Sequence, residues 1–566
     1  MKENITVVEY LINALKAINV HHVFGVPGDF AFPINDAICN SADIEWIGCC
    51  NELNASYAAD GYARIHGIAA LNTTYGPGEL SALCGVAGAY SAHLPIIFIA
   101  GMPSEAVMNS GALMHHTLGD GKFDNFVKMA EHVVEAIAVL TLDNAIDEIN
   151  RVIQLALHTK RPVYIALPED VAIKTLENPI DFHFSFEPLP ASNDVIDISE
   201  LIASKINSAI KPLIMVGEHA RVSDAIKNAE ALIDTCNLPF STMFADKSII
   251  DETNSNFIGL CDGKVINKAV NDYVESSDFI LNIGALFTDF NTGAFSITWP
   301  ANMINVYSDY IEIDGEIISP LNYNLLLEEI TKRVTPRNDK YICHMGYENL
   351  EFHENLEVKK QDLITAESLY PTLESFFKED DQIIAETGTI SMGLGLAHLP
   401  KGAIFENQTL WGSIGWATPA SFGASIANPH KRTILLTGEG SHQLTVQEIG
   451  QFHRFGLKPI IILLNNDGYL IERILCKDPM IVYNDLCQWN YSELPKAFGA
   501  KDWLCVRVTT NKELNEALEM ANKANTGVYI EVVTGIMDAS ALAANLAGQL
   551  NPQRGLNVHV SPVQEK

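Results

Sequence analysis

Two short glycine-containing segments near the end of the chain combine residue types that can hold a phosphorylated ligand and a metal ion. Gly-Glu-Gly-Ser at 438–441 follows one apolar run, and Asn-Asp-Gly at 466–468 follows the next. Glycines after a strand let backbone N–H groups approach a diphosphate, and a following helix adds the positive end of its dipole. The Glu439 carboxylate and the Asn466 amide offer hard oxygens that suit Mg²⁺. An ordinary strand-turn-helix would explain the glycines alone, but the combination indicates a diphosphate and metal site.

Other side chains that can move protons lie far from these segments. Glu52 stands at an apparent strand-to-helix junction, Asp29 follows a Pro-Gly pair, His115 and His116 are adjacent in a probable loop, and Glu472 opens a helical stretch. Each has a structural explanation by itself, such as a first-turn carboxylate that favours a helix dipole or a turn residue. Together they form a candidate set of acids and bases.

The elements that must position these residues predict an α/β protein. Short β-rich runs alternate with helical patterns, which favours parallel sheets covered by helices on both faces. A capping box, Thr6 to Glu9, opens the first helix, and residues 177–193 read as a linker. We predict three doubly wound parallel-sheet domains over residues 1–180, 195–335 and 362–566. The strands are expected at 23–26, 69–74, 95–100, 163–167, 212–217, 279–284, 303–307, 382–386, 433–437, 459–464 and 528–533.

Length and composition limit the partners. A chain of 566 residues with 48% hydrophobic residues suits about three domains. The formal charge of −33 would repel nucleic acid and an anionic membrane surface, and the apolar runs are too short to cross a bilayer. The ten cysteines lack disulfide-like spacing, and residues 1–20 lack the pattern of a targeting signal. We therefore expect a cytoplasmic protein that does not bind nucleic acid or membranes.

The segment 438–468 resembles the thiamine-diphosphate motif, in which Gly-Asp-Gly-Ser is followed some two dozen residues later by Asn-Asn. Here Glu439 replaces the aspartate. Its extra methylene moves the carboxylate by about 1.5 Å, whereas Mg²⁺ requires ligands at about 2.0–2.1 Å. Either the backbone retreats or the metal affinity falls. The resemblance implies thiamine diphosphate and Mg²⁺ as cofactors, with Glu439, Asn466 and Gly468 as metal ligands.

The resemblance extends over essentially the whole chain and is to the thiamine-diphosphate-dependent 2-keto acid decarboxylases, which include pyruvate and indolepyruvate decarboxylases. Glu52 matches the glutamate that bonds the aminopyrimidine ring, and Asp29, His115, His116 and Glu472 match the acid/base set. Ile414 matches the residue that holds the cofactor bent. The expected cofactor-binding residues are Thr387, Gly412, Ile414, Gly438, Gly440 and Ser441.

That family also implies a division of labour between domains. The first domain would bind the pyrimidine ring, and the third domain of a neighbouring chain would bind the diphosphate. Asp29, Glu52 and the two histidines would then face Glu439, Asn466 and Glu472 across a subunit interface. We therefore expect a homo-oligomer whose active sites are shared between two chains.

The expected substrate is a small 2-keto acid that is converted into an aldehyde and CO₂. Local matching places five residues around its side chain, namely Phe290, Ser391, Met392, Ile471 and Leu475. Pyruvate-selective relatives tend to carry a bulky aromatic at the position of Ser391, so a serine there predicts a broad preference for longer substrates.

Three alternatives remain open from the sequence. The first is a pyruvate decarboxylase proper. The second is a carboligase of the acetolactate-synthase type, although the paired histidines, Glu472 and the lack of a recognisable flavin-binding feature argue against it. The third is a cofactor-free homologue that acts as a binding protein, which the change at Glu439 suggests.

Overall fold

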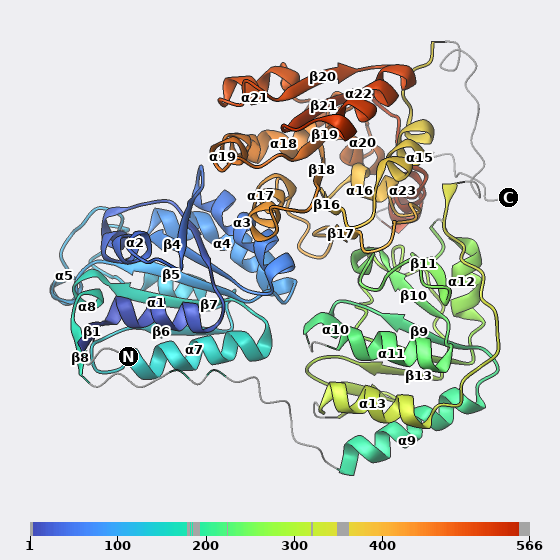
Figure 1. Cartoon of the computed structure of the whole chain (residues 1–566), viewed down its shortest axis with the longest axis horizontal. Helices are drawn as coiled ribbons and strands as arrows, with labels where there is room; N and C mark the ends of the chain where they lie inside the picture. The colour runs from blue at the N-terminus through green and yellow to red at the C-terminus, as the bar shows by residue number, and fades with distance from the viewer. Residues whose placement is uncertain are drawn as a thin grey trace.

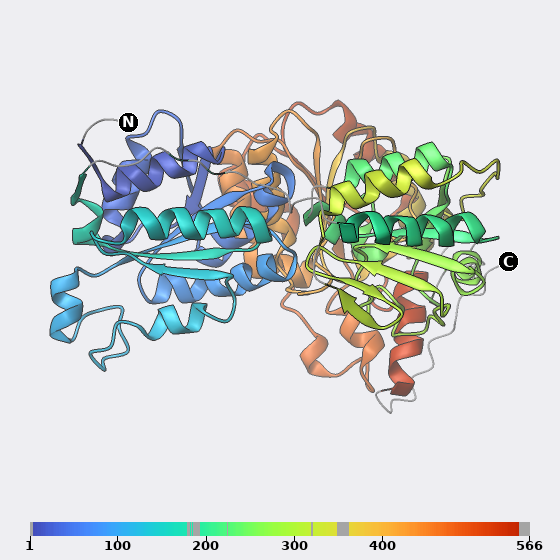
Figure 2. The same cartoon turned by 90° about the horizontal axis from the view of Figure 1, so that it is seen from below.

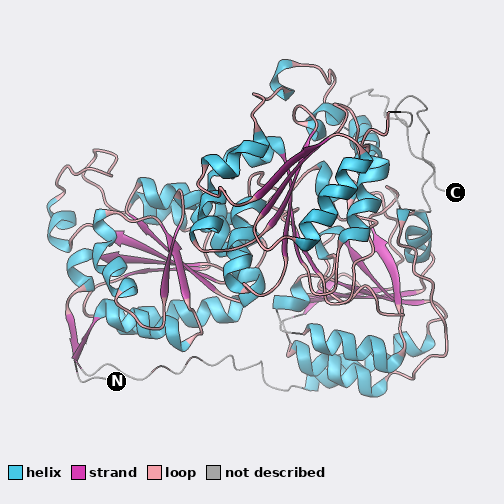
Figure 3. Ribbon diagram, turned by 45° about the horizontal axis from the view of Figure 1, so that its top comes forward, coloured by secondary structure: helices cyan, strands magenta, loops and turns pink. Residues whose placement is uncertain are grey.

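The computed structural model describes residues 4–177, 182, 184, 193–222, 225–265, 267–318, 321–347 and 361–553. Figure 1 shows three α/β units in chain order, and Figure 3 shows each sheet enclosed by helices. The predicted fold class is confirmed. Most of the predicted linker, residues 177–193, lies outside the described residues.

The first unit contains a six-stranded sheet in the order β3-β2-β4-β5-β7-β6, in which every described strand pair is parallel. Its strands are β2 (His22–Gly25), β3 (Glu45–Gly48), β4 (Ala69–Thr74), β5 (Ile96–Met102), β6 (Ala136–Val139) and β7 (Val163–Pro168). Its helices are α1 (Val7–Ala17), the 3-10 turn η1 (Asp29–Ala31), α2 (Phe32–Cys39), α3 (Glu52–His66), α4 (Pro77–Ser91), α5 (Glu105–Ser110), α6 (Asn125–Ala130), α7 (Ala145–Thr159) and α8 (Glu169–Ala172). The predicted capping box opens α1, since Glu9 N–H donates to the Thr6 hydroxyl and Thr6 N–H to the Glu9 carboxylate. A two-stranded ladder joins β1 (Asn4–Thr6) to β8 (Thr175–Glu177).

The second unit contains a seven-stranded sheet in the order β11-β10-β9-β12-β13-β14-β15. Its strands are β9 (Pro212–Val216), β10 (Phe240–Met243), β11 (Phe257–Cys261), β12 (Phe279–Ile283), β13 (Met303–Val306), β14 (Ile311–Ile313) and β15 (Glu316–Ile318). Its helices are α9 (Asn193–Ser208), α10 (His219–Val222), α11 (Ile226–Cys236), η2 (Phe244–Asp246), α12 (Lys268–Glu275) and α13 (Tyr323–Arg333). The sheet is parallel from β11 to β13, but β14 and β15 extend its edge as antiparallel strands. Their connections are too short for a helical crossover, so these strands return as hairpins.

The third unit repeats the topology of the first, with the strand order β17-β16-β18-β19-β21-β20 and parallel pairing. Its strands are β16 (Gln382–Ala385), β17 (Ile404–Glu406), β18 (Thr433–Gly438), β19 (Ile460–Asn465), β20 (Leu504–Val508) and β21 (Val528–Val533). Its helices are α15 (Ala366–Phe376), α16 (Thr389–Gly393), α17 (Ala417–Ala427), α18 (Glu439–Thr445), η4 (Val446–Glu448), α19 (Ile449–Arg454), α20 (Leu470–Leu475), η5 (Val482–Asn484), η6 (Tyr491–Glu493), α21 (Leu494–Ala497), α22 (Asn511–Lys523) and α23 (Ala541–Gln553). In both units the first strand lies between the second and the third. The order of the strands therefore reverses at an equivalent point in each sheet, which is where open α/β sheets bind ligands.

The third unit packs against both of the others, and in Figure 2 its orange elements lie between the first and second units. One buried cluster joins the first and third units and contains Tyr57, Ala58, Trp416 and Ala420, while another joins the second and third. At the first of these junctions α3 crosses α17 in backbone contact. A Cβ added to Gly61 would lie 2.0 Å from the Ala420 carbonyl oxygen, and one added to Gly423 would lie 1.8 Å from that of Ala58. Only glycine permits so close an approach.

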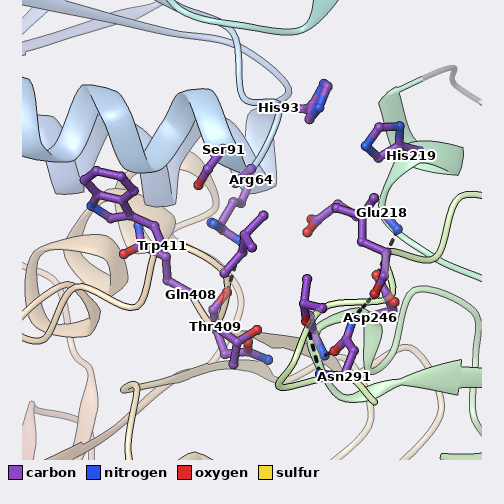
Figure 4. A pocket seen from close by; sticks show the side chains of 16 residues that line it. Arg64, Ser91, His93, Glu218, His219, Asp246, Asn291, Gln408, Thr409 and Trp411 are labelled. Carbon is purple, nitrogen blue, oxygen red and sulfur yellow. Dashed lines mark hydrogen bonds between the residues drawn. The ribbon is translucent and has the colours of Figure 1, made fainter. Parts of the chain in front are cut away.

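All three units meet beside the end of α3 (Figure 4). Arg64 donates to the Asp60 carboxylate at 2.8 Å and to the Glu406 carboxylate at 3.0 Å, and Arg221 of the second unit lies 3.2 Å from the other Glu406 oxygen. The space enclosed here is only about 30 Å³. That volume holds no more than about two water molecules, so the junction is packed and ionic rather than a ligand cavity. In the part of the chain that the structure describes, no helix is long and apolar enough to span a membrane.

Replacement of Gly423 by alanine tests the helix crossing. The added methyl group must push α3 away from α17, and overpacking of this kind should lower the free energy of unfolding by about 1–3 kcal/mol. Thermal unfolding of the purified variant measures this. The matched control is Gly548→Ala in α23, where a Cβ meets nothing within 4 Å, so helix propensity should leave the protein equally or slightly more stable. Equal stability of both variants would contradict the close crossing.

Candidate active site

The carboxyl ends of the sheets place the predicted site residues. In the first unit Asp29 follows β2 in η1, and Glu52 is the first residue of α3 after β3. In the third unit Glu439 follows β18 as the first residue of α18, and Asn466 follows β19 directly. Because carboxyl ends of parallel strands share one edge of a sheet, each unit collects its polar residues at its own edge. The strand expected at 433–437 is β18, and α18 begins directly after it at Glu439.

A cavity of about 340 Å³ lies at this edge of the third sheet. Ten of the predicted residues line it, which are Thr387, Ile414, Gly438, Glu439, Gly440, Ser441, Asn466, Gly468, Ile471 and Glu472. The sequence interpretation did not assign a role to the other lining residues, which are Gly388, Thr389, Ile390, Tyr469, Leu470 and Tyr483. Gly412, which was also predicted to bind the cofactor, is not among the lining residues and lies two residues before Ile414. Its φ of 68° is a conformation that favours glycine.

The residues around Glu439 suit a hard metal ion. One Glu439 carboxylate oxygen accepts the N–H groups of Asn466 at 3.1 Å and Gly468 at 2.9 Å. These two bonds fix the Glu439 side chain and leave its second oxygen for a ligand. The Asn466 side-chain oxygen is buried and has no hydrogen-bond partner, which is costly unless a cation or a ligand satisfies it. Both groups line the cavity together with Gly468, so the donor set fits Mg²⁺.

Burial perturbs the acidity of this site. Burial raises the pKa of Glu439 to about 7, against the lowering effect of the backbone N–H groups of Gly468 and Asn466. Glu386, at the end of β16, is fully buried and accepts the N–H groups of Thr387 and Ala417, each at 3.2 Å. Its burial raises its pKa to about 8.

Arg473 is a residue that the sequence interpretation missed. Its side chain is 1% exposed and donates to the carbonyl oxygens of Asn466 at 3.3 Å and Asp467 at 2.7 Å. A Cβ on Gly468, where φ is 147°, would lie 2.4 Å from the Arg473 guanidinium. The guanidinium therefore holds the loop 466–468 from behind. Arg473 lies four residues after Tyr469 in a helical stretch. The sequence did not indicate its role, because a buried arginine on a helix cannot be distinguished from an exposed one by sequence alone.

Asp29, His115 and His116 meet at the edge of the first sheet. The His115 Nε2 atom lies 2.7 Å from the Asp29 carboxylate, and ligand-type atoms of all three residues lie within 4.8 Å of one another. The His115 ring stacks on Phe30 with centroids 4.9 Å apart, and the His116 ring meets Phe30 edge-on. Partial burial raises the pKa of Asp29, but the hydrogen bond and the charge of His115 outweigh this and lower it overall.

The loop that carries the histidines is held in place by Gly76. His116 has φ of 63°, and its carbonyl oxygen would lie 2.2 Å from a Cβ on Gly76, where φ is 74°. Glu79 closes the same turn, since it accepts from Gly76 N–H at 2.7 Å and from the Tyr164 hydroxyl at 2.5 Å. Burial raises the pKa of Glu79 to about 7. The capping pattern Gly-Pro-Gly-Glu could have indicated this residue from the sequence.

Glu52 is half-buried at the start of α3. Asn51 caps the helix by accepting from Asn54 N–H at 2.8 Å, which leaves the Glu52 side chain free to point away from the cap. A Cβ on Gly78 would lie 3.2 Å from the Glu52 carboxylate. Burial raises the pKa of Glu52, so this carboxyl group retains a proton to higher pH than an exposed glutamate.

Four of the five residues predicted to form the substrate pocket belong to or pack against one core cluster of the second and third units, namely Phe290, Met392, Ile471 and Leu475. Ile471 lines the cavity, whereas the other four are not among the described lining residues. Ser391 is fully buried in α16 and donates to the Gly388 carbonyl oxygen at 3.1 Å, and Met392 beside it is buried in the core. Phe290 packs against Phe244, and Leu475 packs partly buried against the same core cluster.

Within the described part of the chain, the two groups of polar residues form separate half-sites. The residues that line the cavity all come from the third unit, and Asp29, Glu52 and His115 are absent from that lining. Glu472 is exposed on the cavity side. One chain therefore carries the predicted residues of both the first and the third unit, but they do not line one common cavity.

Comparisons with known proteins identify the family of the chain. The sequence matches the N-terminal TPP binding domain, the central domain and the C-terminal TPP binding domain of thiamine pyrophosphate enzymes over residues 5–122, 199–321 and 386–532. It is 37% identical to the pyruvate decarboxylase of Kluyveromyces lactis over 94% of this chain and 96% of that protein. It is 38% identical to pyruvate decarboxylase isozyme 3 of Saccharomyces cerevisiae, over 90% and 91%, and 34% identical to the alpha-keto-acid decarboxylase of Mycobacterium bovis, over 97% and 98%. The chain therefore belongs to the family of thiamine-diphosphate-dependent 2-keto acid decarboxylases.

Proposed function

We propose that this chain uses thiamine diphosphate and Mg²⁺ to convert 2-keto acids longer than pyruvate into aldehydes and CO₂, in active sites shared between two copies. The observation that carries this proposal is the half-site of the third unit, where the unpartnered oxygen of Asn466 faces a cavity that Glu439 and the glycine turn also line. The relatives that are named for pyruvate and for alpha-keto acids support the reaction class.

The diphosphate end of the cofactor would bind at the start of α18. Gly438, Gly440 and Ser441 expose backbone N–H groups there, and a Cβ on Gly440 would lie 2.5 Å from the Tyr469 ring, so glycine is required. Glu439, Asn466 and the carbonyl group of Gly468 would hold Mg²⁺. The Glu439 side chain is one methylene longer than the aspartate of the motif. The two N–H groups that bond its carboxylate hold it near the loop 466–468, which would offset the extra length.

Thiamine diphosphate, when bound, supplies the electron sink that no amino-acid side chain provides for the carbanion left by CO₂. The first unit supplies proton handling. Glu52, whose pKa is raised by burial, would share a hydrogen bond with the pyrimidine ring. Asp29, His115 and His116 would bind the substrate carboxylate region and return a proton to the product, with Glu472 acting from the other half-site.

A second copy of the chain would complete each site. The cavity has no described lining from the first unit, which supports a site in which Glu52 reaches a cofactor held by the third unit of another copy. Exposed apolar side chains border both half-sites, including Leu113 at 76% and Val482 at 78% exposed. Burial of such side chains against a partner copy would stabilise the assembly.

The preference for longer acids is proposed from the resemblance, because pyruvate-selective relatives tend to carry a bulky aromatic at the position of Ser391. Ser391 itself is buried outside the cavity lining, with its hydroxyl bonded to the Gly388 carbonyl oxygen. Cytoplasmic location is proposed on the composition of the chain and on the thiols of Cys49 and Cys50, which are adjacent and not joined in a disulfide.

Replacement of Glu52 by glutamine tests the first half-site. The amide cannot act as an acid, so turnover should fall by at least about 100-fold, whereas affinity for thiamine diphosphate should stay within about threefold of the unchanged protein. Steady-state assay and calorimetric titration measure the two quantities. Loss of cofactor binding instead would show that Glu52 belongs to the binding site and that its role is misassigned.

A substrate series tests the reaction and its preference. The purified protein with thiamine diphosphate and Mg²⁺ is assayed against pyruvate, linear and branched longer 2-keto acids, phenylpyruvate and indolepyruvate. We expect kcat/KM to be higher for the longer acids by about tenfold or more, since each methylene in an apolar pocket changes binding by about 1–3 kcal/mol. A pyruvate preference would contradict the proposed preference, and no activity on any acid, even with excess Mg²⁺, would contradict the proposed reaction.

A further inference from the structure

The start of α3, which carries Glu52, is bonded to a carboxylate of the third unit. One oxygen of Glu448, in η4, accepts the Asn54 side-chain amide at 2.7 Å and the Cys50 backbone N–H at 3.2 Å. Cys50 and Asn54 flank Glu52 by two residues on each side. The backbone on both sides of Glu52 is therefore bonded to a residue of the third unit.

Glu448 is fully buried, although it is ionisable. Burial of a carboxylate is costly unless donors compensate it, and the start of a helix provides the positive end of the dipole. One Glu448 oxygen therefore gains a favourable electrostatic environment and two donors, the Cys50 N–H just before the N-cap Asn51 and the Asn54 side-chain amide. Such a pairing fixes position more strictly than apolar packing does, because hydrogen bonds weaken sharply with changes in length and angle.

The opposite end of α3 is held by a second carboxylate of the same unit. Arg64 donates to Glu406 at 3.0 Å, and between the two ends Gly61 brings α3 against α17. The helix is 15 residues long, so its ends lie about 22 Å apart. Fixation at two such distant points prevents both sliding along the helix axis and rotation about it.

We propose that Glu448 is a positioning residue that sets the location of Glu52 in the active site. The proposal rests on the proposed function, in which Glu52 bonds the pyrimidine ring. Glu448 is not among the residues that line the cavity. It holds the Cys50 N–H and the Asn54 side chain so that the Glu52 carboxyl group leaves the first turn of α3 in a single direction. A displacement of about 1 Å at such a group can cost about 100-fold in rate.

Three variants separate position from charge. Glu448→Leu removes the acceptor and fills the buried site with an apolar side chain of similar size. Glu448→Gln keeps an acceptor without the charge. The measurement is the rate at which the C2 proton of bound thiamine diphosphate exchanges with deuterium, at saturating cofactor and Mg²⁺. We expect the leucine variant to be about 100-fold slower than the unchanged protein, with little change in substrate KM, and the glutamine variant to recover to within about fivefold. If the leucine variant does not fold, Glu448→Asp replaces it with the same expectation, because the shorter side chain withdraws the acceptor.

A second readout does not require the loaded enzyme. Hydrogen exchange of the cofactor-free protein, followed by mass spectrometry of its peptides, should show faster exchange at residues 50–57 in the leucine variant and protection restored by glutamine. The matched control is Asp381→Asn. Asp381 is also a buried carboxylate of the third unit, but it pairs with Arg432 away from α3. This control should lose stability without a change in exchange at either the C2 proton or residues 50–57.

The outcomes distinguish this inference from the proposed function. If Glu52→Gln slows C2 exchange but Glu448→Leu leaves it unchanged, Glu448 does not position Glu52 and the inference is wrong. If C2 exchange is as slow in Glu448→Gln as in Glu448→Leu, the charge of Glu448 rather than its position explains the effect, and the inference is also wrong. If Glu52→Gln itself leaves C2 exchange unchanged, the proposed role of Glu52 fails first.

Discussion

Backbone contact between α3 and α17 is the constraint on which the arrangement of the two half-sites depends. Glycines at 61 and 423 let the helices approach until carbonyl oxygens of one face Cα atoms of the other. Since α3 begins with Glu52 and α17 follows the loop of Ile414, this single crossing sets the first unit against the third. Helix pairs with larger side chains at the crossing would lie several ångströms further apart. The ion pair of Arg64 with Glu406 and the hydrogen bonds that Glu448 accepts then fix the remaining degrees of freedom of α3.

The same topology in the first and third units serves two different chemistries. Each sheet collects polar residues where its strand order reverses, but the first edge carries acids and histidines and the third carries glycines and metal-type oxygens. Buried carboxyl groups occur at both edges, and burial raises the pKa of Glu79, Glu386 and Glu439. Such groups destabilise the folded chain as pH rises, because the folded state must bury a charge above its unfolded pKa. Their retention at these edges fits a site that exchanges protons and binds cations.

Much of the fold followed from the sequence because its strands are buried on both faces. The strands expected at 69–74 and 528–533 became β4 and β21, which are buried almost throughout, and the glycine turn after β18 and the loop after β19 lie where their motifs indicated. The edge strands β14 and β15 escaped prediction, because they are short, partly exposed and paired as hairpins. Glu448 also escaped prediction, because its partner Asn54 is 394 residues away in the sequence. Arg473 escaped prediction although Asp467 is only 6 residues away, because the sequence does not show that the arginine is buried. The burial of Ser391, whose hydroxyl bonds the Gly388 carbonyl oxygen, also escaped prediction, because it depends on packing around α16 rather than on a local pattern.

The central claim, that two copies of the chain complete each active site, is tested most directly with hybrid dimers. One chain carries Glu52→Gln and the other Glu439→Ala, each with its own affinity tag, and dimers that contain both chains are isolated on the two tags in succession. Each altered chain alone should be inactive. The hybrid should recover about half of the unchanged activity, because one of its two sites then combines an intact first unit with an intact third unit from the other chain. An inactive hybrid, with cofactor and Mg²⁺ at saturation, would contradict the account, because it would mean that both halves of a site must come from one chain.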